Sequence, residues 1–338
     1  MHYIGMDVHK KVTMICVLDE NGKVVREAVA KGSLRELVRQ LKALRREVGG
    51  TVKVAYEASS GCGWLFDQLT AAGMAVQVAH PGKLRMIFRS KRKNDRVDAR
   101  KIAKLLYLDE VPLAYMPESS IRQWRSLIEY RHAVVVHRGS AKRRLRALLH
   151  NHGIDAPRGL WTKKGMAWLR EVEFAEAPGL QRDLLLEELD RLEAQIGRLE
   201  TVLEKLAAAS SAVQVLMTIP GVGIRTAEAV AAYMAAPERF RRNKSVGCYF
   251  GLVPCEDTSV QARLGHITKE GPSTVRSLVT EATWQSIRRD AGVRAFYERV
   301  CRNDPQRKKI ALIATAHHLL RVMHAMLRSG EAWRSAAA

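Results

Sequence analysis

The first hundred residues alternate between short apolar runs of β character and longer segments whose apolar positions recur every three or four residues. The short runs predict strands at 3–8, 12–18, 24–30, 52–56 and 75–79. Asn21-Gly22 is typical of a hairpin turn, and Ser33 can cap a helix that runs to about residue 48. Further helices are predicted at 63–72 and 95–106. The predicted order is therefore β-β-β-α-β-α-β-α.

Three hairpin-joined strands followed by βα units form the strand order of a ribonuclease-H-like sheet. In such a sheet the first and fourth strands are neighbours, so residues at their carboxyl ends would lie close together. The sequence therefore predicts an α/β fold class for this part of the chain.

The remaining sequence predicts helices, first a strongly basic stretch at 117–152 and then a heptad pattern. The heptad positions are spaced alternately by four and three, at Leu185, Leu189, Leu192, Ile196, Leu199, Leu203 and Leu206. The segment 180–206 holds seven acids and four bases, so it is a poor surface for nucleic acid. We expect it to associate copies of the chain, with an intramolecular helical hairpin as the alternative.

The chain is strongly basic, because 56 Lys and Arg against 35 Asp and Glu give a formal net charge of +21. A polyanionic partner explains that excess best, and nucleic acid is the commonest one. We find no apolar run of membrane-spanning length, no lipidation motif and no secretory segment, so we expect a cytoplasmic prokaryotic protein without a membrane partner. Five cysteines without a Cys-x-x-Cys pair argue against a disulfide framework and a zinc site.

Four carboxylates occur where the predicted elements would bring them together. Asp7 lies near the end of the first strand, and Glu57 ends the fourth. Asp95 and Asp98 are three residues apart on a helix, so they face the same way. Each acid alone is most simply paired with a nearby Lys or Arg. Together they favour a site for Mg²⁺ or Mn²⁺, because grouped carboxylates repel unless cations lie between them. Two such ions can clamp the oxygens of a phosphodiester exchange.

Basic residues surround the third and fourth acids, since the segment 83–104 holds ten Lys or Arg among 22 residues. A basic field would draw a phosphate backbone towards a metal site, whereas a solvated basic helix is the alternative. The residues expected to contact nucleic acid here and in the basic helix are Lys91, Arg92, Lys93, Arg96, Lys142, Arg143 and Arg144.

A second region for phosphate binding is predicted after residue 210. The sequence Ile-Pro-Gly-Val-Gly before a helix resembles a helix-hairpin-helix, in which Gly221 and Gly223 would let backbone N–H groups approach a phosphate. A plain turn is the alternative. In the loop 251–271, Arg263 and Lys269 are further candidates for contact with nucleic acid. From spacing alone Ser259 is an ordinary loop serine, although a serine can attack phosphorus when its ionisation is assisted.

Taken together, these segments resemble the DEDD transposases of the insertion-sequence "one-ten" family, which also includes pilin-gene invertases. The resemblance covers nearly the whole chain. Its N-terminal part lies in YIGMDVHKK, VAYEASSG and KNDRVDARKIA, and its C-terminal part in TIPGVGIRTA, GLVPCEDTS and RLGHITKEG.

The resemblance implies three parts: a RuvC-like domain at 1–155 with a basic helical extension, a coiled-coil segment at 156–210, and a mostly helical transposase domain at 211–338. It implies that Asp7, Glu57, Asp95 and Asp98 bind Mg²⁺ or Mn²⁺. It also implies that Ser259 forms a phosphoserine link to DNA, with Ser273 as second choice.

The resemblance further implies partners. A structured bridge RNA would pair with donor and target DNA. Dimers or tetramers would build a composite site from the metal domain of one subunit and the serine of another, and the 185–206 seam fits such a homo-oligomer.

We therefore expect a transposase or site-specific recombinase of a mobile element. Three alternatives stay open: a site-specific DNA invertase, a nuclease like Holliday-junction resolvases that uses metal-activated water, and a nucleic-acid-binding protein without catalysis.

Overall fold

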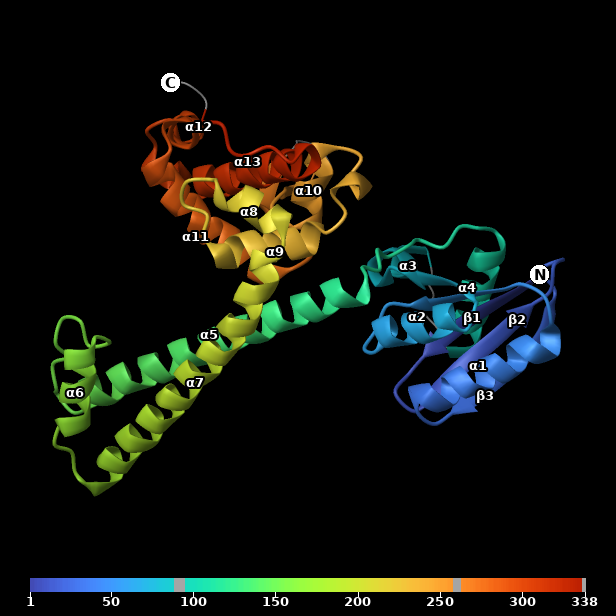
Figure 1. The fold of residues 1–338 in the computed structure, drawn as a ribbon, viewed down its shortest axis with the longest axis horizontal. Coiled ribbons are helices and arrows are strands. Elements are labelled where there is room, and N and C mark those ends of the chain that lie inside the picture. Colours follow the sequence, from blue (N-terminus) through green and yellow to red (C-terminus); the bar gives the residue numbers. More distant parts are fainter. Residues whose placement is uncertain (88–94, 258–262, 336–338) are drawn as a thin grey trace. The chain divides into compact units, whose positions relative to one another are not determined.

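The computed structural model describes residues 1–87, 95–257 and 263–335, and the side chains of 256, 257, 263 and 264 are not described (Figure 1). Contacts within the chain divide it into two compact units, Met1–Arg122 and Gln123–Ala338. These are called the N-terminal unit and the C-terminal unit below, and each has its own buried core.

The N-terminal unit contains a five-stranded sheet in the order β3-β2-β1-β4-β5. Its strands are β1 (His2–Val8), β2 (Val12–Leu18), β3 (Val24–Lys31), β4 (Val52–Glu57) and β5 (Ala75–Ala79). β1 pairs antiparallel with β2 and parallel with β4. The prediction that the first and fourth strands are neighbours is therefore confirmed.

Helices cover both faces of this sheet. They are α1 (Leu34–Val48), α2 (Cys62–Ala71), α3 (Pro81–Ile87) and α4 (Asp95–Tyr107), of which α3 was not predicted. Ser33 caps α1 as expected, in a capping box with Glu36. Leu41 of α1 and Leu65 of α2 pack with Ile4 on one face, whereas Ala99 of α4 packs on the other.

The C-terminal unit is mostly helical. Its helices are α5 (Ser119–Asn151), which begins just before the boundary, α6 (Lys163–Glu171), α7 (Glu176–Ala208), α8 (Ser211–Met217), α9 (Ile224–Met234), α10 (Asn243–Tyr249), α11 (Ser273–Arg289), α12 (Ala291–Cys301) and α13 (Lys308–Ser329). Two short 3₁₀ helices lie at Pro237–Arg239 and Pro305–Arg307, and β6 (Pro254–Asp257) pairs antiparallel with β7 (Arg263–Ile267).

The heptad seam is buried within a single chain. Leu189 of α7 packs with Leu145 and Leu149 of α5, and Leu192 packs with Val134. The seam positions that are buried are Leu185, Leu189, Leu192, Ile196 and Leu203. The α5–α7 hairpin therefore buries most of the seam within one chain.

One helical stretch of the described residues, Pro305–Ser329, is long and apolar enough to span a membrane by length and composition, although the sequence analysis expected none. Half of its most apolar window is buried inside the C-terminal unit. Its buried side chains include Leu319, Leu320 and Met323. Packing in a helical core accounts for this apolar composition.

Candidate functional site

A glycine in β1 lets α4 lie directly on the sheet. A Cβ atom on Gly5 would stand 2.2 Å from the backbone N of Ala103 and 2.3 Å from the backbone O of Ala99. Side chains two apart on a strand share a face, so Asp7 lies on the face that α4 covers. The close approach at Gly5 therefore brings the first turn of α4 to Asp7.

Asp7, His9 and Asp95 form a group in which one potential ligand atom of each lies within 4.8 Å of the others. His9 Nε2 is 3.1 Å from Asp7 Oδ2 and 3.6 Å from Asp95 Oδ2. The side chain of Asp7 is only 16% exposed, whereas His9 and Asp95 are open to solvent. Two of the four predicted acids therefore meet, joined by a histidine.

Of the other two predicted acids, Asp98 lies on α4 with Asp95, and Glu57 lies on β4, the strand beside β1. The charge of Asp98 contributes to the raised pKa of Asp7, and the Asp98 carboxylate lies 3.6 Å from Lys101 Nζ. Glu57 is the last residue of β4, one residue beyond Tyr56, which pairs with Met6 of β1. Asp7 and Glu57 are therefore the next residues along these two neighbouring parallel strands, at the same edge of the sheet.

Electrostatics at Asp7 favour a bound cation. Burial raises the pKa of Asp7 above its ordinary value of 3.8, His9 opposes this rise, and the charges of Asp95 and Asp98 add to it. A carboxylate that loses water and faces other carboxylates is costly to ionise. A divalent cation would offset that cost. Carboxylate oxygens suit Mg²⁺ or Mn²⁺, whereas an imidazole is a ligand of softer divalent ions. The carboxylates of this group thus fit a divalent cation.

His9 was missed by the sequence analysis. The signal was available, because His9 stands two residues after Asp7, and alternation along an extended segment puts both side chains on one side. An imidazole at that spacing is an ordinary surface residue unless a helix brings further ligands to it.

The basic residues expected to bind nucleic acid fall into different settings. Lys91, Arg92 and Lys93 lie outside the described residues. Arg96 is exposed on α4, and Arg143 and Arg144 are exposed on α5. Lys142 lies 3.6 Å from Glu193 and 5.1 Å from the ring centre of Trp161, so it makes contacts within the chain.

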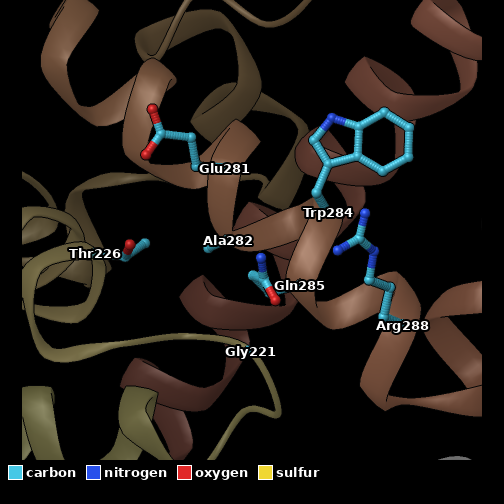
Figure 2. Close-up of a pocket in the computed structure, with 7 residues that line it drawn as sticks. All are labelled: Gly221, Thr226, Glu281, Ala282, Trp284, Gln285 and Arg288. Carbon is cyan, nitrogen blue, oxygen red and sulfur yellow. The ribbon is translucent and has the colours of Figure 1, made fainter. Parts of the chain in front are cut away.

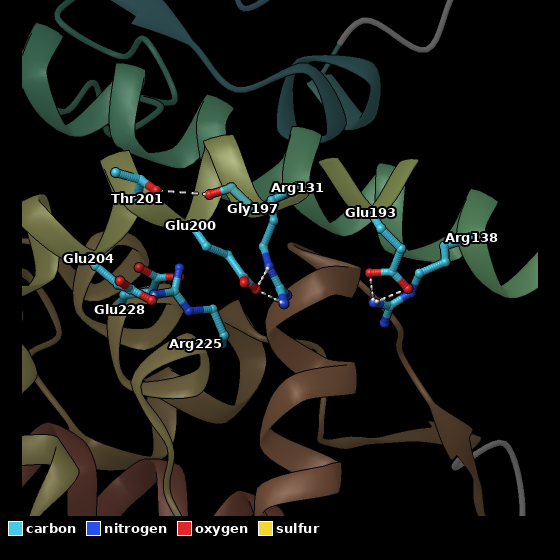
Figure 3. A network of polar contacts seen from close by, with 9 residues as sticks. All are labelled: Arg131, Arg138, Glu193, Gly197, Glu200, Thr201, Glu204, Arg225 and Glu228. Carbon is cyan, nitrogen blue, oxygen red and sulfur yellow. Dashed lines mark hydrogen bonds and ion pairs between the residues drawn. The ribbon is translucent and has the colours of Figure 1, made fainter. Parts of the chain in front are cut away.

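Part of the basic charge of α5 is matched by acids of α7. Arg131 lies 2.5 Å from Glu200, and Arg138 lies 3.1 Å from Glu193 (Figure 3). This pairing explains why the heptad segment is acidic while the helix at 117–152 is basic. These arginines stabilise the helical pair, so the surface available to nucleic acid on α5 is smaller than the sequence suggests.

The two glycines of the turn between α8 and α9 differ. Gly221 has a φ of 92°, and a Cβ there would stand 2.5 Å from the backbone N of Ser286, so packing against α11 requires this glycine. Gly223 precedes α9 and is exposed, and a Cβ there would meet nothing within 4 Å. Open space at a helix N-terminus leaves backbone N–H groups accessible to a phosphate.

The predicted serine loop lies between β6 and β7. Ser259 is outside the described residues, as is the side chain of Arg263. Lys269 is exposed after β7, and Ser273 is exposed at the start of α11. The antiparallel pairing of β6 with β7 means that the segment carrying Ser259 joins two adjacent strands.

Comparisons with known proteins cover both units. A sequence family described as a transposase matches residues 4–154, and a family described as the transposase IS116/IS110/IS902 family matches residues 213–298. A probable family 20 transposase of Pseudomonas aeruginosa is 28% identical over 98% of both chains. The transposase for insertion sequence element IS1111A of Coxiella burnetii is 30% identical over 82% of this chain and 75% of its own. The transposase for insertion sequence element IS1328 of Yersinia enterocolitica is 28% identical over 68% and 69%.

Proposed function

The chain belongs to the IS116/IS110/IS902 family of transposases, and from that premise we propose that it cuts and rejoins DNA at the ends of an insertion sequence through a metal-assisted phosphoserine intermediate. The observation that carries the metal half of this proposal is the meeting of Asp7 with Asp95 and His9 at the edge of the sheet. Asp7, Glu57, Asp95 and Asp98 would hold Mg²⁺ or Mn²⁺ in a RuvC-like, ribonuclease-H-like domain. Bound there, the metal would stabilise negative charge on the phosphodiester oxygens.

Ser259 is the proposed nucleophile. Its Oγ attacks phosphorus, the new O–P bond forms as the strand's P–O bond breaks, and the DNA hydroxyl leaves with a proton. Attack by a second DNA hydroxyl on the phosphoserine then rejoins DNA and releases the serine, so no net bond energy is consumed. His9, within 3.1 Å of Asp7, would keep that carboxylate oriented towards the reacting phosphate.

The remaining elements of the proposal are the partners. We propose that a structured bridge RNA from the element pairs with donor and target DNA, and that a homo-oligomer joins the metal residues of one subunit to the serine of another. The net charge of +21 supports contact with such polyanions.

Trapping the intermediate tests this function. The protein is incubated with Mg²⁺, labelled element-end DNA and the noncoding RNA encoded beside the gene, and covalent protein–DNA adducts are separated under denaturing conditions. Asp7→Asn and Ser259→Ala should each lower adduct formation by roughly a thousandfold. Ser273→Ala serves as the matched serine control and should form adduct normally.

Two results would contradict the proposal. Cleavage that survives Ser259→Ala but not Asp7→Asn would indicate a nuclease that uses metal-activated water. Full recombination by Asp7→Asn would remove the metal site from the mechanism.

A further inference from the structure

Two hollows border the same stretch of α11 in the C-terminal unit. The first has a volume of about 580 Å³ and is lined by Gly221, Thr226, Glu281, Ala282, Trp284, Gln285 and Arg288 (Figure 2). The second has a volume of about 420 Å³ and is lined by Leu252, Ile267, Lys269, Arg276, Ser277, Thr280, Glu281, Trp284 and Ile313. Trp284 and Glu281 belong to both linings, so these two side chains form the ridge between the hollows.

Trp284 presents its ring to solvent at this ridge. Its side chain is a large aromatic that is 39% exposed, although its indole also contacts the Tyr297 ring at a centroid distance of 5.9 Å. That contact restrains the indole, so a ligand that stacks on Trp284 would lose little side-chain entropy. Glu281, Gln285 and Arg288 lie on the same helix face at intervals of four and three residues. Figure 2 shows the indole and the Arg288 guanidinium on the same flank of α11.

The polar groups of the first hollow suit a neutral, flat ligand. Glu281 and Arg288 carry opposite charges, and Gln285 offers both a donor and an acceptor. A free phosphate would meet the carboxylate of Glu281. A nucleobase has no net charge, exposes hydrogen-bonding edges and offers a π face for stacking on an aromatic ring.

The second hollow and the nearby turn suit the phosphates on either side of such a base. Lys269 and Arg276 line the second hollow, where their two positive charges outweigh the single carboxylate of Glu281. Arg276 donates hydrogen bonds to the backbone carbonyls of Phe250 and Gly271 at 3.2 Å, so its charge is held in place. Beyond the first hollow, exposed Gly223 opens the N-terminus of α9.

We propose that Trp284, with Gln285 and Arg288, binds an unpaired nucleobase of a DNA strand whose backbone runs from the α8–α9 turn towards Lys269 and Arg276. Because Lys269 follows β7, this path would bring an unpaired strand to the carboxyl end of β7. The inference rests on the proposed function for its DNA partner. It assigns an aromatic base-binding site that the metal and serine chemistry does not require.

Equilibrium binding of the full-length protein tests the site without chemistry. Anisotropy is measured in EDTA at fixed salt with three labelled probes: a 20-nucleotide single strand, its duplex, and a single strand of equal length made of abasic sites. Trp284→Ala should weaken binding of the base-containing single strand about tenfold and leave the other two probes unchanged. Trp284→Phe keeps a ring and should retain most of the affinity.

A matched pair of arginine variants controls for charge. Arg288 lines the hollow, whereas Arg289, the next residue, is exposed but lines neither hollow. Arg288→Ala should weaken binding of the base-containing single strand more than Arg289→Ala does. An equal loss of affinity for both variants on all three probes would show that the arginines act only through their charge, and it would overturn the proposal.

Further outcomes are equally decisive. An unchanged affinity of Trp284→Ala for the single strand would overturn the base site. A loss seen only with an RNA strand of the same sequence would overturn the DNA assignment. If thermal unfolding shows that Trp284→Ala is not folded like the wild type, Trp284→Phe and Arg288→Ala test the site instead. A single strand that carries 5-iodouracil is also photocrosslinked to the wild-type protein, and the crosslink should map to Trp284.

The result is independent of the test of function. The binding assay is run in EDTA, so it does not measure metal-dependent chemistry. If the anisotropy assay contradicts the base-binding site, the proposed transposase function still stands. If the adduct assay contradicts that function, the base-binding site still stands.

Discussion

Glu228 on α9 is a carboxyl group almost fully enclosed by protein, with 1% of its surface exposed. One of its oxygens lies 3.1 Å from Arg225, which also lies 3.6 Å from Glu204 of α7 (Figure 3). Burial raises the pKa of Glu228 to about 7, against the opposing effect of Arg225. Arg225 therefore links α9 to α7, and it lies beside a carboxyl group whose pKa is near neutral pH.

The raised pKa of Glu228 predicts how stability depends on pH. Between its ordinary pKa of 4.5 and about 7, the folded chain keeps a proton that the unfolded chain has released, so the free energy of unfolding falls as pH rises. Each pKa unit corresponds to about 1.4 kcal/mol, giving a loss of about 3 kcal/mol by pH 8. Glu228→Gln lacks this loss, so its stability relative to the wild type should rise between pH 5 and pH 8 in urea unfolding.

Glu238→Gln, which removes an exposed carboxylate from the same unit, is the control for Glu228→Gln. The opposite trend, with the wild type gaining stability over Glu228→Gln as pH rises, would mean that the Arg225 ion pair outweighs the cost of burial.

His9 should contribute to metal binding beside Asp7 and Asp95. Its Nε2 atom lies within 4.8 Å of a carboxylate oxygen of each, so His9→Ala removes a ligand or the group that orients one. We expect Mn²⁺ affinity to fall about tenfold, measured by titration calorimetry. His150→Ala, an exposed histidine of α5, should bind Mn²⁺ as the wild type does. Unchanged affinity in His9→Ala would exclude His9 from the site.

At the scale of elements, the contact between α4 and β1 depends on Gly5, which has no side chain. A methyl group at Gly5 would overlap the backbone of Ala99 and Ala103, and backbone cannot move aside as a flexible side chain does. Gly5→Ala should therefore displace α4, lowering the free energy of unfolding by about 1–3 kcal/mol and weakening Mn²⁺ binding.

Gly197→Ala is the matched control for Gly5→Ala. Gly197 lies inside α7, where an added Cβ would meet nothing within 4 Å, so alanine should stabilise the helix by about 0.5–1 kcal/mol. Gly5→Ala with wild-type stability and wild-type Mn²⁺ affinity would show that α4 is not held against Gly5 in solution.

The α5–α7 pair shows how far an element's pattern constrains its partner. Seven positions at heptad spacing predicted a buried seam, and five of them are buried, but the helix that covers them belongs to the same chain. Periodicity identifies the face that is buried. It does not identify what buries it, because α5 and a second copy of α7 could both supply apolar side chains.

At the scale of the whole molecule, the boundary at Arg122 and Gln123 predicts independent folding. A fragment of residues 123–338 keeps the buried seam and the helical core around Leu320, so it should unfold cooperatively with the helical content of that unit in the full chain. Circular dichroism during urea unfolding measures this. A non-cooperative fragment would show that the N-terminal unit is needed for its fold.

Much of the N-terminal unit follows from the sequence alone. Strand alternation, the Asn21-Gly22 turn and the Ser33 cap are local signals, and each acts over a few residues in the same way whatever surrounds it. The positions of Asp7 and Glu57 at strand ends, and of Asp95 and Asp98 on one helix face, followed from the same local rules. The net charge of +21 likewise predicted a polyanionic partner, which agrees with membership of a transposase family.

Only the tertiary structure decided which distant residues meet. It brought Asp95 to Asp7 and His9 across a close contact at Gly5, buried the heptad seam with α5, and left Trp284 exposed between two hollows. The physical reason is that local backbone preferences involve neighbours in sequence, whereas burial and desolvation depend on which elements pack together. The sequence by itself thus determined the elements and the chemical groups they carry, and packing decided which of those groups can act together.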